Sequence, residues 1–491
     1  MPPRWLASGI VWIATGMAAR VWGADDGIQV EQVSAQPVGQ AVERLERTIE
    51  EQQLKIEVLR HRLTAHPAGG PQEDGVEQVK RLVRELMSDG AFRNSLYPDV
   101  AQVGYDEGFY IKRSDEVFLL KISGMMQVRW TGTQRRTDNL RVYGRTRQDD
   151  TGGFEVQYLE LNFDGQIHGP KLLYHISLIG DTDRENAWQT YYAQILYECS
   201  EELVLSAGIL DLPQGFNNLV ADHKQLFVDR AMAEEVFNVG YTPGVALSGL
   251  LFGRLEYAVG VFNGIGNTTD GPSREELDTN FAYAASLIYH LLGDGVGDDE
   301  TDLPFRRDPL WDVGGSFAYH DDNGDLSGSG FYSIPDRVRR GRGIGGYAEA
   351  DLTGTELLQF GAHTAFRWRG FSLTAEWYLR VIDGEGAHSP WELLTDRSDP
   401  VHFQGGYIEA GYFVLPKKLE LAARLGGIWD AGGDGTWEYT FGVNYYPFGS
   451  HNFKIQADFT RIDEVPLDST NGNWFQNDET ILFRVALQAV F

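Results

Sequence analysis

From about residue 105 to the end of the chain, apolar and polar residues alternate one by one over long segments. Between Val117 and Trp130 the even positions are mostly apolar, whereas the odd positions include Lys121, Gln127 and Arg129. Successive side chains of a β-strand point to opposite faces, so this period of two predicts long strands with one apolar face. We identify about sixteen such segments, near residues 117–130, 153–164, 171–179, 188–197, 202–210, 243–252, 253–262, 280–290, 309–320, 355–368, 370–381, 403–414, 417–428, 436–447, 452–463 and 479–491.

The connections between these segments are of two kinds. Some are tight turns, such as Arg369-Gly370 and Pro416-Lys417, and others are long and rich in Gly and Asp. The long connections are 211–242, 263–279, 291–308, 321–354 and 382–402. Short turns at one end, long loops at the other, and Trp or Tyr at strand ends are typical of a transmembrane β-barrel. A soluble sandwich or propeller does not explain so many long strands with an apolar face that continues to the last residue.

We therefore predict an all-β fold, a 16-stranded antiparallel transmembrane β-barrel over residues 105–491, with a short N-terminal α-helical coiled-coil segment. That segment spans residues 36–65, where a three-and-four spacing repeats without a break, at Val42, Leu45, Ile49, Gln52, Ile56, Leu59 and Leu63. Such a narrow stripe favours self-association through a coiled coil. The alternative is a single amphipathic helix on the protein's own surface. Residues 66–104 follow as a linker and short helix.

The first 23 residues have the layout of a secretory signal peptide. Arg4 supplies a positive charge, Trp5 to Ala19 is mostly apolar, and a plausible cleavage point precedes Ala24 or Asp25. The apolar run is shorter than the ~18 to 20 residues that a membrane-spanning helix needs. We expect residues 1–23 to be removed and the chain to leave the cytoplasm.

Composition changes this picture little. The chain has 42 Lys and Arg against 71 Asp and Glu, a formal charge of −29, which argues against nucleic acid as a partner. The mean hydropathy of −0.31 excludes a helical membrane protein, but half of each barrel strand faces water, so a barrel is compatible with it. The single cysteine, Cys199, excludes a disulfide framework and a thiolate zinc cluster.

Several stretches, taken in order along residues 105–491, resemble the phosphate-selective porin O/P family of Gram-negative outer membranes. They are Gly108–Ile111 with Phe118–Arg129, Gly153–Gly165, Ala207–Ile209 with Pro213–Phe216, Tyr257–Gly264, Val443–Gly449 and the terminal Phe491. The resemblance implies an outer-membrane barrel, normally a homotrimer in outer-membrane lipid, that passes small hydrophilic solutes or anions by diffusion. It also implies that Phe491 is read by the barrel-assembly machinery and that the coiled coil lies in the periplasm.

The alternation assigns the residues that face the lumen if the apolar face points outward. The inward basic residues would be Lys121, Arg129, Arg367, Arg369, Arg380, Arg424, Lys454 and Arg484. The inward acids would be Glu160, Glu376, Glu409, Glu420 and Asp458. A file of arginines can attract anions and bind phosphate with two hydrogen bonds. Alternatively, Arg and Glu of neighbouring strands pair across the lumen and stiffen the wall; both interpretations remain open.

The resemblance implies that loop 211–242 folds into the barrel as a constriction loop. This loop carries His223, Lys224 and Arg230, together with acids that include Asp222 and Asp229. It lacks the dense basic set of the phosphate-binding relatives, so we expect only a weak preference for anions. A second basic cluster, at residues 337–342, is interpreted as part of a solvated loop.

Nothing in the sequence points to catalysis. There is no HExxH pair, no GxSxG elbow and no nucleotide-binding loop, and no adjacent strands offer outward Ser and His for a lipid-cleaving barrel. The acidic stretches 298–302 and 321–325 could hold Ca²⁺, but solvated loop tips are the favoured interpretation. We expect no metal, no cofactor and no enzyme activity. The alternative to a porin is a structural tether in which the coiled coil binds the cell wall and conduction is incidental.

Overall fold

The computed structural model describes residues 101–113, 117–136, 141–142, 145–146, 150–180, 188–216, 219–265, 281–322, 355–383, 401–430, 435–463, 474 and 479–491. The signal peptide (1–23) and the coiled-coil segment (36–65) lie outside these residues and stay predictions, as does nearly all of the linker. Within the described ranges, no helix is long and apolar enough to cross a membrane.

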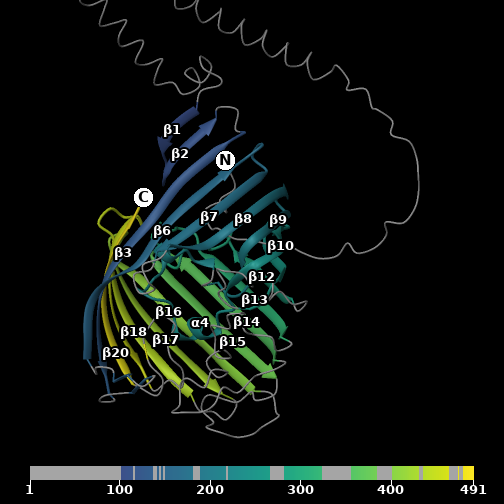
Figure 1. Ribbon diagram of the computed structural model, residues 1–491. Helices are drawn as coiled ribbons and strands as arrows, with labels where there is room; N and C mark the ends of the chain where they lie inside the picture. The colour runs from purple at the N-terminus through teal and green to yellow at the C-terminus, as the bar shows by residue number, and fades with distance from the viewer. Residues whose placement is uncertain are drawn as a thin grey trace, which may run out of the picture. The chain divides into compact units, whose positions relative to one another are not determined.

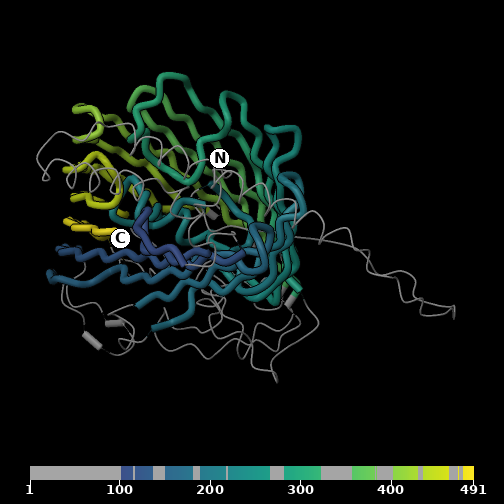
Figure 2. Tube along the Cα trace, turned by 90° about the horizontal axis from the view of Figure 1, so that it is seen from above, coloured from purple at the N-terminus to yellow at the C-terminus, as the bar shows by residue number. Residues whose placement is uncertain are grey.

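Sixteen antiparallel strands close into a barrel, in which each strand pairs with its neighbours in sequence and the last pairs with the first (Figures 1 and 2). They are β3 (Leu119–Arg135), β6 (Asp150–Gln166), β7 (Leu172–Gly180), β8 (Trp188–Ser200), β9 (Leu203–Asp211), β10 (Tyr241–Leu251), β11 (Leu255–Phe262), β12 (Ala282–Leu292), β13 (Leu310–Asp322), β14 (Thr355–Trp368), β15 (Phe371–Asp383), β16 (Val401–Leu415), β17 (Leu419–Asp430), β18 (Gly435–Tyr445), β19 (Phe453–Ile462) and β20 (Thr480–Val490). Each of the sixteen predicted segments overlaps one of these strands, so the barrel prediction is confirmed. A small ribbon of β4 (Arg141–Val142) and β5 (Arg145–Thr146) lies between β3 and β6.

A separate hairpin precedes the barrel. It consists of β1 (Ala101–Tyr105), which begins within the predicted linker, and β2 (Phe109–Arg113). β2 pairs with Leu119–Ile122 of β3, and β20 pairs with Met125–Arg135 along the same edge of β3. The terminal Phe491 closes the barrel between these two pairings, since its backbone exchanges two hydrogen bonds of 2.9 Å with Gly124.

The alternation places apolar side chains outside and polar side chains inside, as predicted. On β17, Leu421 and Leu425 are 47% and 41% exposed, whereas Glu420 and Arg424 are 0% and 4% exposed. A closed barrel has no exposed backbone edge, and its outer face can therefore contact lipid while the inner face contacts water and polar loops.

Two predictions about the connections were wrong. Arg369 was expected in the lumen, but it is exposed in the turn from β14 to β15, where its φ of 50° ends the alternation and its guanidinium lies over Trp368. Connection 291–308 was grouped with the long loops of the opposite end. It follows β12, however, which is the eighth strand of the barrel. Barrel strands of even rank end where the short turns lie, so this connection lies at the end that carries the short turns.

The position of that connection is fixed by its contacts with a short turn. The amide of Arg369 donates to the carbonyl of Arg306, at 3.0 Å, and the amide of Gly370 donates to the carboxylate of Asp302, at 2.6 Å. Asp302 is buried, as are Glu300 and Thr301, because this segment folds into the barrel. We call residues 293–309 the inward turn, and we call this end of the barrel, which includes Phe491, the turn end.

A second segment enters the lumen from the opposite end. Residues 212–240, which connect β9 to β10 and which we call the constriction loop, contain η3 (Asp222–Lys224) and α4 (Met232–Phe237). α4 packs against β16 and β17, and the amide of Met232 donates to the Glu438 carboxylate of β18 at 2.7 Å (Figure 1). The loop is thus held against one side of the barrel wall.

Candidate functional site

Two arginines from the wall bind one aspartate of the constriction loop. Arg129 of β3 and Arg484 of β20 both contact Oδ2 of Asp229, at 2.7 and 2.6 Å. Arg129 also pairs with Glu155, and Arg484 pairs with Asp458 of β19 at 2.7 Å. All but Glu155 are buried, so these contacts lock the middle of the loop to the wall.

Arg424 and Lys454 hold the loop at Asp229 and in the residues just before it. Arg424 donates to Glu409 at 2.9 Å and to the backbone carbonyl of Asp229 at 3.1 Å, and its guanidinium lies 4.3 Å from the ring centre of Phe227. Lys454 donates to the carbonyl of Gln225 at 2.8 Å. The loop's own carbonyls therefore accept hydrogen bonds from cationic side chains of the wall.

Arg380 and Arg367 bind backbone carbonyls in the same way. Arg380 donates to Phe237 at the end of α4, at 2.8 Å, and Arg367 donates through two nitrogens to Asp299 of the inward turn, at 3.0 Å each. Six of the eight basic residues predicted for the lumen are therefore buried anchors of the inward-folded segments. Their contacts favour the second of the two interpretations, pairing that stiffens the structure, although most partners lie on these segments.

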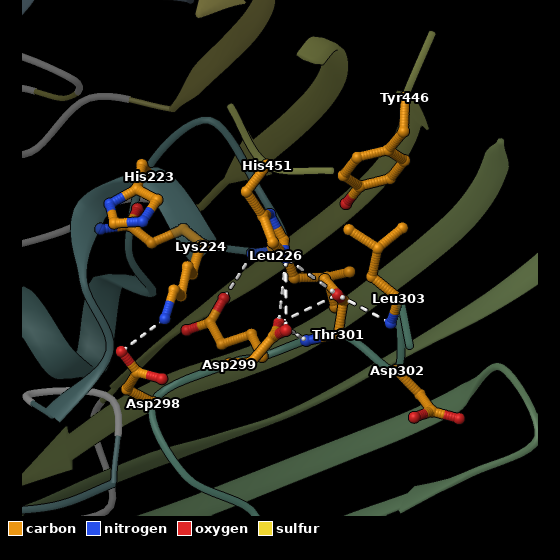
Figure 3. Close-up of polar contacts among 12 residues, drawn as sticks. His223, Lys224, Leu226, Asp298, Asp299, Thr301, Asp302, Leu303, Tyr446 and His451 are labelled. Carbon is orange, nitrogen blue, oxygen red and sulfur yellow. Dashed lines mark hydrogen bonds and ion pairs between the residues drawn. The ribbon is translucent and has the colours of Figure 1, made fainter. Parts of the chain in front are cut away.

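The inward turn and the constriction loop meet in the lumen (Figure 3). Lys224 Nζ lies 2.6 Å from a carboxylate oxygen of Asp298, and Glu300 accepts the backbone amide of Leu226. Asp299 lies 3.3 Å from His451, in the turn between β18 and β19. The acids of stretch 298–302 thus bind protein groups here, which leaves the Ca²⁺ interpretation without free ligands in this stretch.

The charges around this junction shift the pKa values of its members. Burial alone would raise the pKa of Asp299, but His451, the amide of Thr301 and Lys224 together hold it well below its usual range. Burial, together with the positive charge of the neighbouring Lys224, lowers the pKa of His223 well below its usual value. At neutral pH the junction therefore holds an ionised Asp299 beside a neutral His223.

A cavity of about 530 Å³ remains between the constriction loop and the opposite wall, and it extends to the turn end. The predicted residues Lys121, His223, Lys224 and Arg230 all line it. Its acidic lining residues are Glu107, Glu160, Asp164, Asp211, Asp222 and Asp299. The cavity beside the loop is thus lined by charged side chains of both signs.

Arg230 belongs to the cavity and to the constriction loop at once. It contacts Asp222 at 2.8 Å and Glu234 of α4 at 3.9 Å. Burial would lower its pKa, but Glu234 and Asp222 raise it well above the usual value. Burial raises the pKa of Glu234 to about 7, because the nearby Arg230 offsets only part of the desolvation.

Residues that the sequence did not single out also line the cavity. Three tyrosines, Tyr191, Tyr192 and Tyr241, face it from β8 and β10. Tyr191 breaks the alternation of inward and outward side chains on β8, because a β-bulge turns it inward. The sequence gives no signal for that bulge. Over the described part of the chain, no group of three or more His, Cys, Asp or Glu side chains could hold a metal ion.

Comparison with known proteins agrees with this geometry. Residues 312–472 match the model of the family described as phosphate-selective porin O and P. No curated protein sequence matches the chain. Among solved structures, an anion-selective porin from Comamonas acidovorans has a TM-score of 0.51 at 8% identity, covering 76% of this chain and 100% of that one. The outer membrane channel DcaP of Acinetobacter baumannii has a TM-score of 0.47 at 11% identity, covering 76% and 97%. At 8% identity the likeness to the anion-selective porin is one of fold alone.

Proposed function

We infer that this chain, whose residues 312–472 match the model of the phosphate-selective porin O and P family, is a porin that passes small hydrophilic solutes across the outer membrane by diffusion. One observation carries the proposal. The constriction loop is bound to one side of a closed sixteen-stranded barrel and leaves, on the other side, a cavity lined by charged side chains of both signs. Diffusion requires a wetted path of suitable width and charge and no chemical step, and the family and fold are those of a channel.

The preference for anions is proposed to be weak. Lys121, Lys224 and Arg230 supply positive charge to the cavity, which supports attraction of anions. Lys224 is paired with Asp298, however, and Arg230 is paired with Asp222. Most of the other predicted basic residues are engaged as anchors. The free positive charge that a phosphate-specific pore needs is therefore small.

The placement in the envelope is part of the same proposal. The turn end would face the periplasm, with Phe491 presented to the barrel-assembly machinery and the apolar outer face in outer-membrane lipid. Outward side chains of β20 such as Phe483 and Leu487, which are exposed, support that contact with lipid. We propose a homotrimer, to which the predicted coiled coil 36–65 would contribute from the periplasm after removal of the signal peptide.

The proposal is tested with the full mature chain in a planar lipid bilayer. We expect discrete conductance steps in KCl and, under a KCl gradient, a reversal potential displaced slightly toward that of chloride. A clear displacement toward the potassium potential would reject the anion preference. A bilayer without steps would reject the porin itself.

A further inference from the structure

Two consecutive tyrosines on β8 face the same cavity, which a regular strand does not allow. In the pairing of β7 with β8, Tyr192 lies opposite Ser177 and Thr190 lies opposite Leu178, so Tyr191 is an extra residue in a β-bulge. The ring centres of Tyr191 and Tyr192 are 4.2 Å apart, and both rings line the cavity. A bulge re-aims a side chain that would otherwise point to the other face, here toward lipid, and bulges are over-represented at the rims of barrels and next to active sites.

A third tyrosine completes the group where the constriction loop leaves the wall. Tyr241, the first residue of β10, lies opposite Asp211, the last residue of β9. Its ring is 4.8 Å from that of Tyr191, at an interplanar angle of 88°, and 6.0 Å from that of Tyr192. Three aromatic rings on two strands thus form one cluster on the cavity wall.

Two carboxylates of the same cavity accept hydrogen bonds from neutral donors. Asp211 accepts a hydrogen bond of 2.7 Å from the hydroxyl of Tyr192, and Glu160 accepts one of 3.2 Å from the hydroxyl of Ser177. Two other acids of the cavity already have basic partners, since Asp164 binds His175 and Asp222 binds Arg230. Asp211 and Glu160 thus accept hydrogen bonds from neutral hydroxyls, and both line the cavity.

Aromatic faces carry partial negative charge and attract ammonium groups, and a neighbouring carboxylate strengthens that attraction. We propose that Tyr191, Tyr192 and Tyr241, with Asp211 and Glu160, form a subsite for small organic cations, namely solutes in which an ammonium group is joined to an apolar body. The subsite lies in the cavity of the proposed diffusion path and so rests on the proposed function. It adds to a weakly selective pore a place where one class of solute pauses.

The test is current block of the full mature porin in a planar bilayer. The probe is 2-phenylethylammonium, and its matched controls are 2-phenylethanol and phenylacetate, which keep the ring and chain but are neutral or anionic. We expect saturable block of the KCl current by the cation and about tenfold weaker block by the two controls, since the ammonium makes charge-assisted contacts that they lack. Equal block by all three compounds, or no block by the cation, would overturn the subsite.

Variants locate the effect. Asp211→Asn and Glu160→Gln each replace a carboxylate by a neutral amide, and Tyr191→Leu removes a ring. Block is measured as a fraction of each channel's own open current, and the cation is expected to block each variant about tenfold more weakly than the parent. Asp294→Asn, at the exposed tip of the inward turn, is the matched control, and the cation should block its current as strongly as it blocks that of the parent. Unchanged block in all three variants overturns the assignment. If Asp211→Asn fails to assemble because it loses the Tyr192 contact, Glu160→Gln decides. Steps in KCl without block reject the subsite alone, whereas absence of steps rejects the porin.

Discussion

Lys224 of the constriction loop and Asp298 of the inward turn form an ion pair of 2.6 Å that joins the two segments folded into the barrel from opposite ends (Figure 3). The pair is partly exposed, and Lys224 lines the cavity. Asp298 therefore cancels a positive charge at the edge of the cavity, and it also ties the constriction loop to the inward turn.

Neutralising Asp298 is expected to reveal that charge. In Asp298→Asn, Lys224 keeps its position near the cavity but loses its ionised partner, so the ratio of anion to cation permeability should rise about two- to fivefold, as for the ~0.5–1 kcal/mol of a partly exposed charge contact. Reversal potentials under a KCl gradient measure the ratio. Asp294→Asn changes the same charge on the same turn without this contact and should behave as the parent. A ratio that falls in Asp298→Asn would contradict the role given to this pair.

Asp229 is expected to be the main anchor of the constriction loop. Asp229→Asn leaves Arg129 and Arg484 with a weakened buried partner, and breaking a buried ion pair costs about 3–5 kcal/mol when a charge is left uncompensated. We expect a lower unfolding temperature and larger, noisier conductance steps. Arg136→Gln, which removes a pair whose arginine is 71% exposed, is the control and should change the free energy of unfolding by less than about 1 kcal/mol. Unchanged conductance in Asp229→Asn would show that the loop is held by other contacts.

Glu234 is expected to make the stability of the loop depend on pH. Its pKa is raised from 4.5 to about 7 by burial, so the ionised form disfavours the folded loop above pH 7, and that cost disappears as pH falls toward 4.5. Glu234→Gln should therefore stabilise the protein at pH 8.5, by less than about 3 kcal/mol, and should have no stabilising effect at pH 4. Urea unfolding in detergent at both pH values measures the difference. Glu201→Gln, in an exposed turn, is the control. Equal effects of Glu234→Gln at the two pH values would exclude this cause.

The outer face is expected to tolerate charge poorly. Leu487 points outward from β20, and an arginine there would have to contact lipid, at a cost of about 2–4 kcal/mol near the middle of the membrane. We expect Leu487→Arg to lower the yield of folded barrel in vesicles, measured by resistance to unfolding in gels. The control is Gln488→Asn. Gln488 is the next residue and points inward, and this change keeps a polar side chain on the inner face. Normal folding of Leu487→Arg would contradict the assignment of β20 to lipid.

The period of two was enough to predict the strands and their two faces, because lipid outside and water inside impose the alternation on every strand. It therefore placed Lys121, Arg129, Arg424 and Arg484 inside correctly. Arg369 was misplaced because the alternation was carried one residue beyond the strand, into a turn with positive φ.

The partners of the inward residues could not be predicted. Arg484 and Asp229 lie 255 residues apart in sequence, and their contact depends on how an irregular loop folds within the closed barrel. The inward turn was missed because its Gly- and Asp-rich composition is that of an external loop, although counting strands would have placed it at the turn end. Tyr191 was missed because a single extra residue in a strand has no mark in the sequence.

The central claim is that the chain is a diffusion porin whose open path lies beside an anchored constriction loop. Single-channel recording of the full mature chain and of Asp229→Asn in the same bilayer tests it most directly. We expect steady conductance steps for the parent and larger, noisier steps for the variant. Absence of steps in the parent would contradict the porin, and identical steps in both would contradict the part played by the loop.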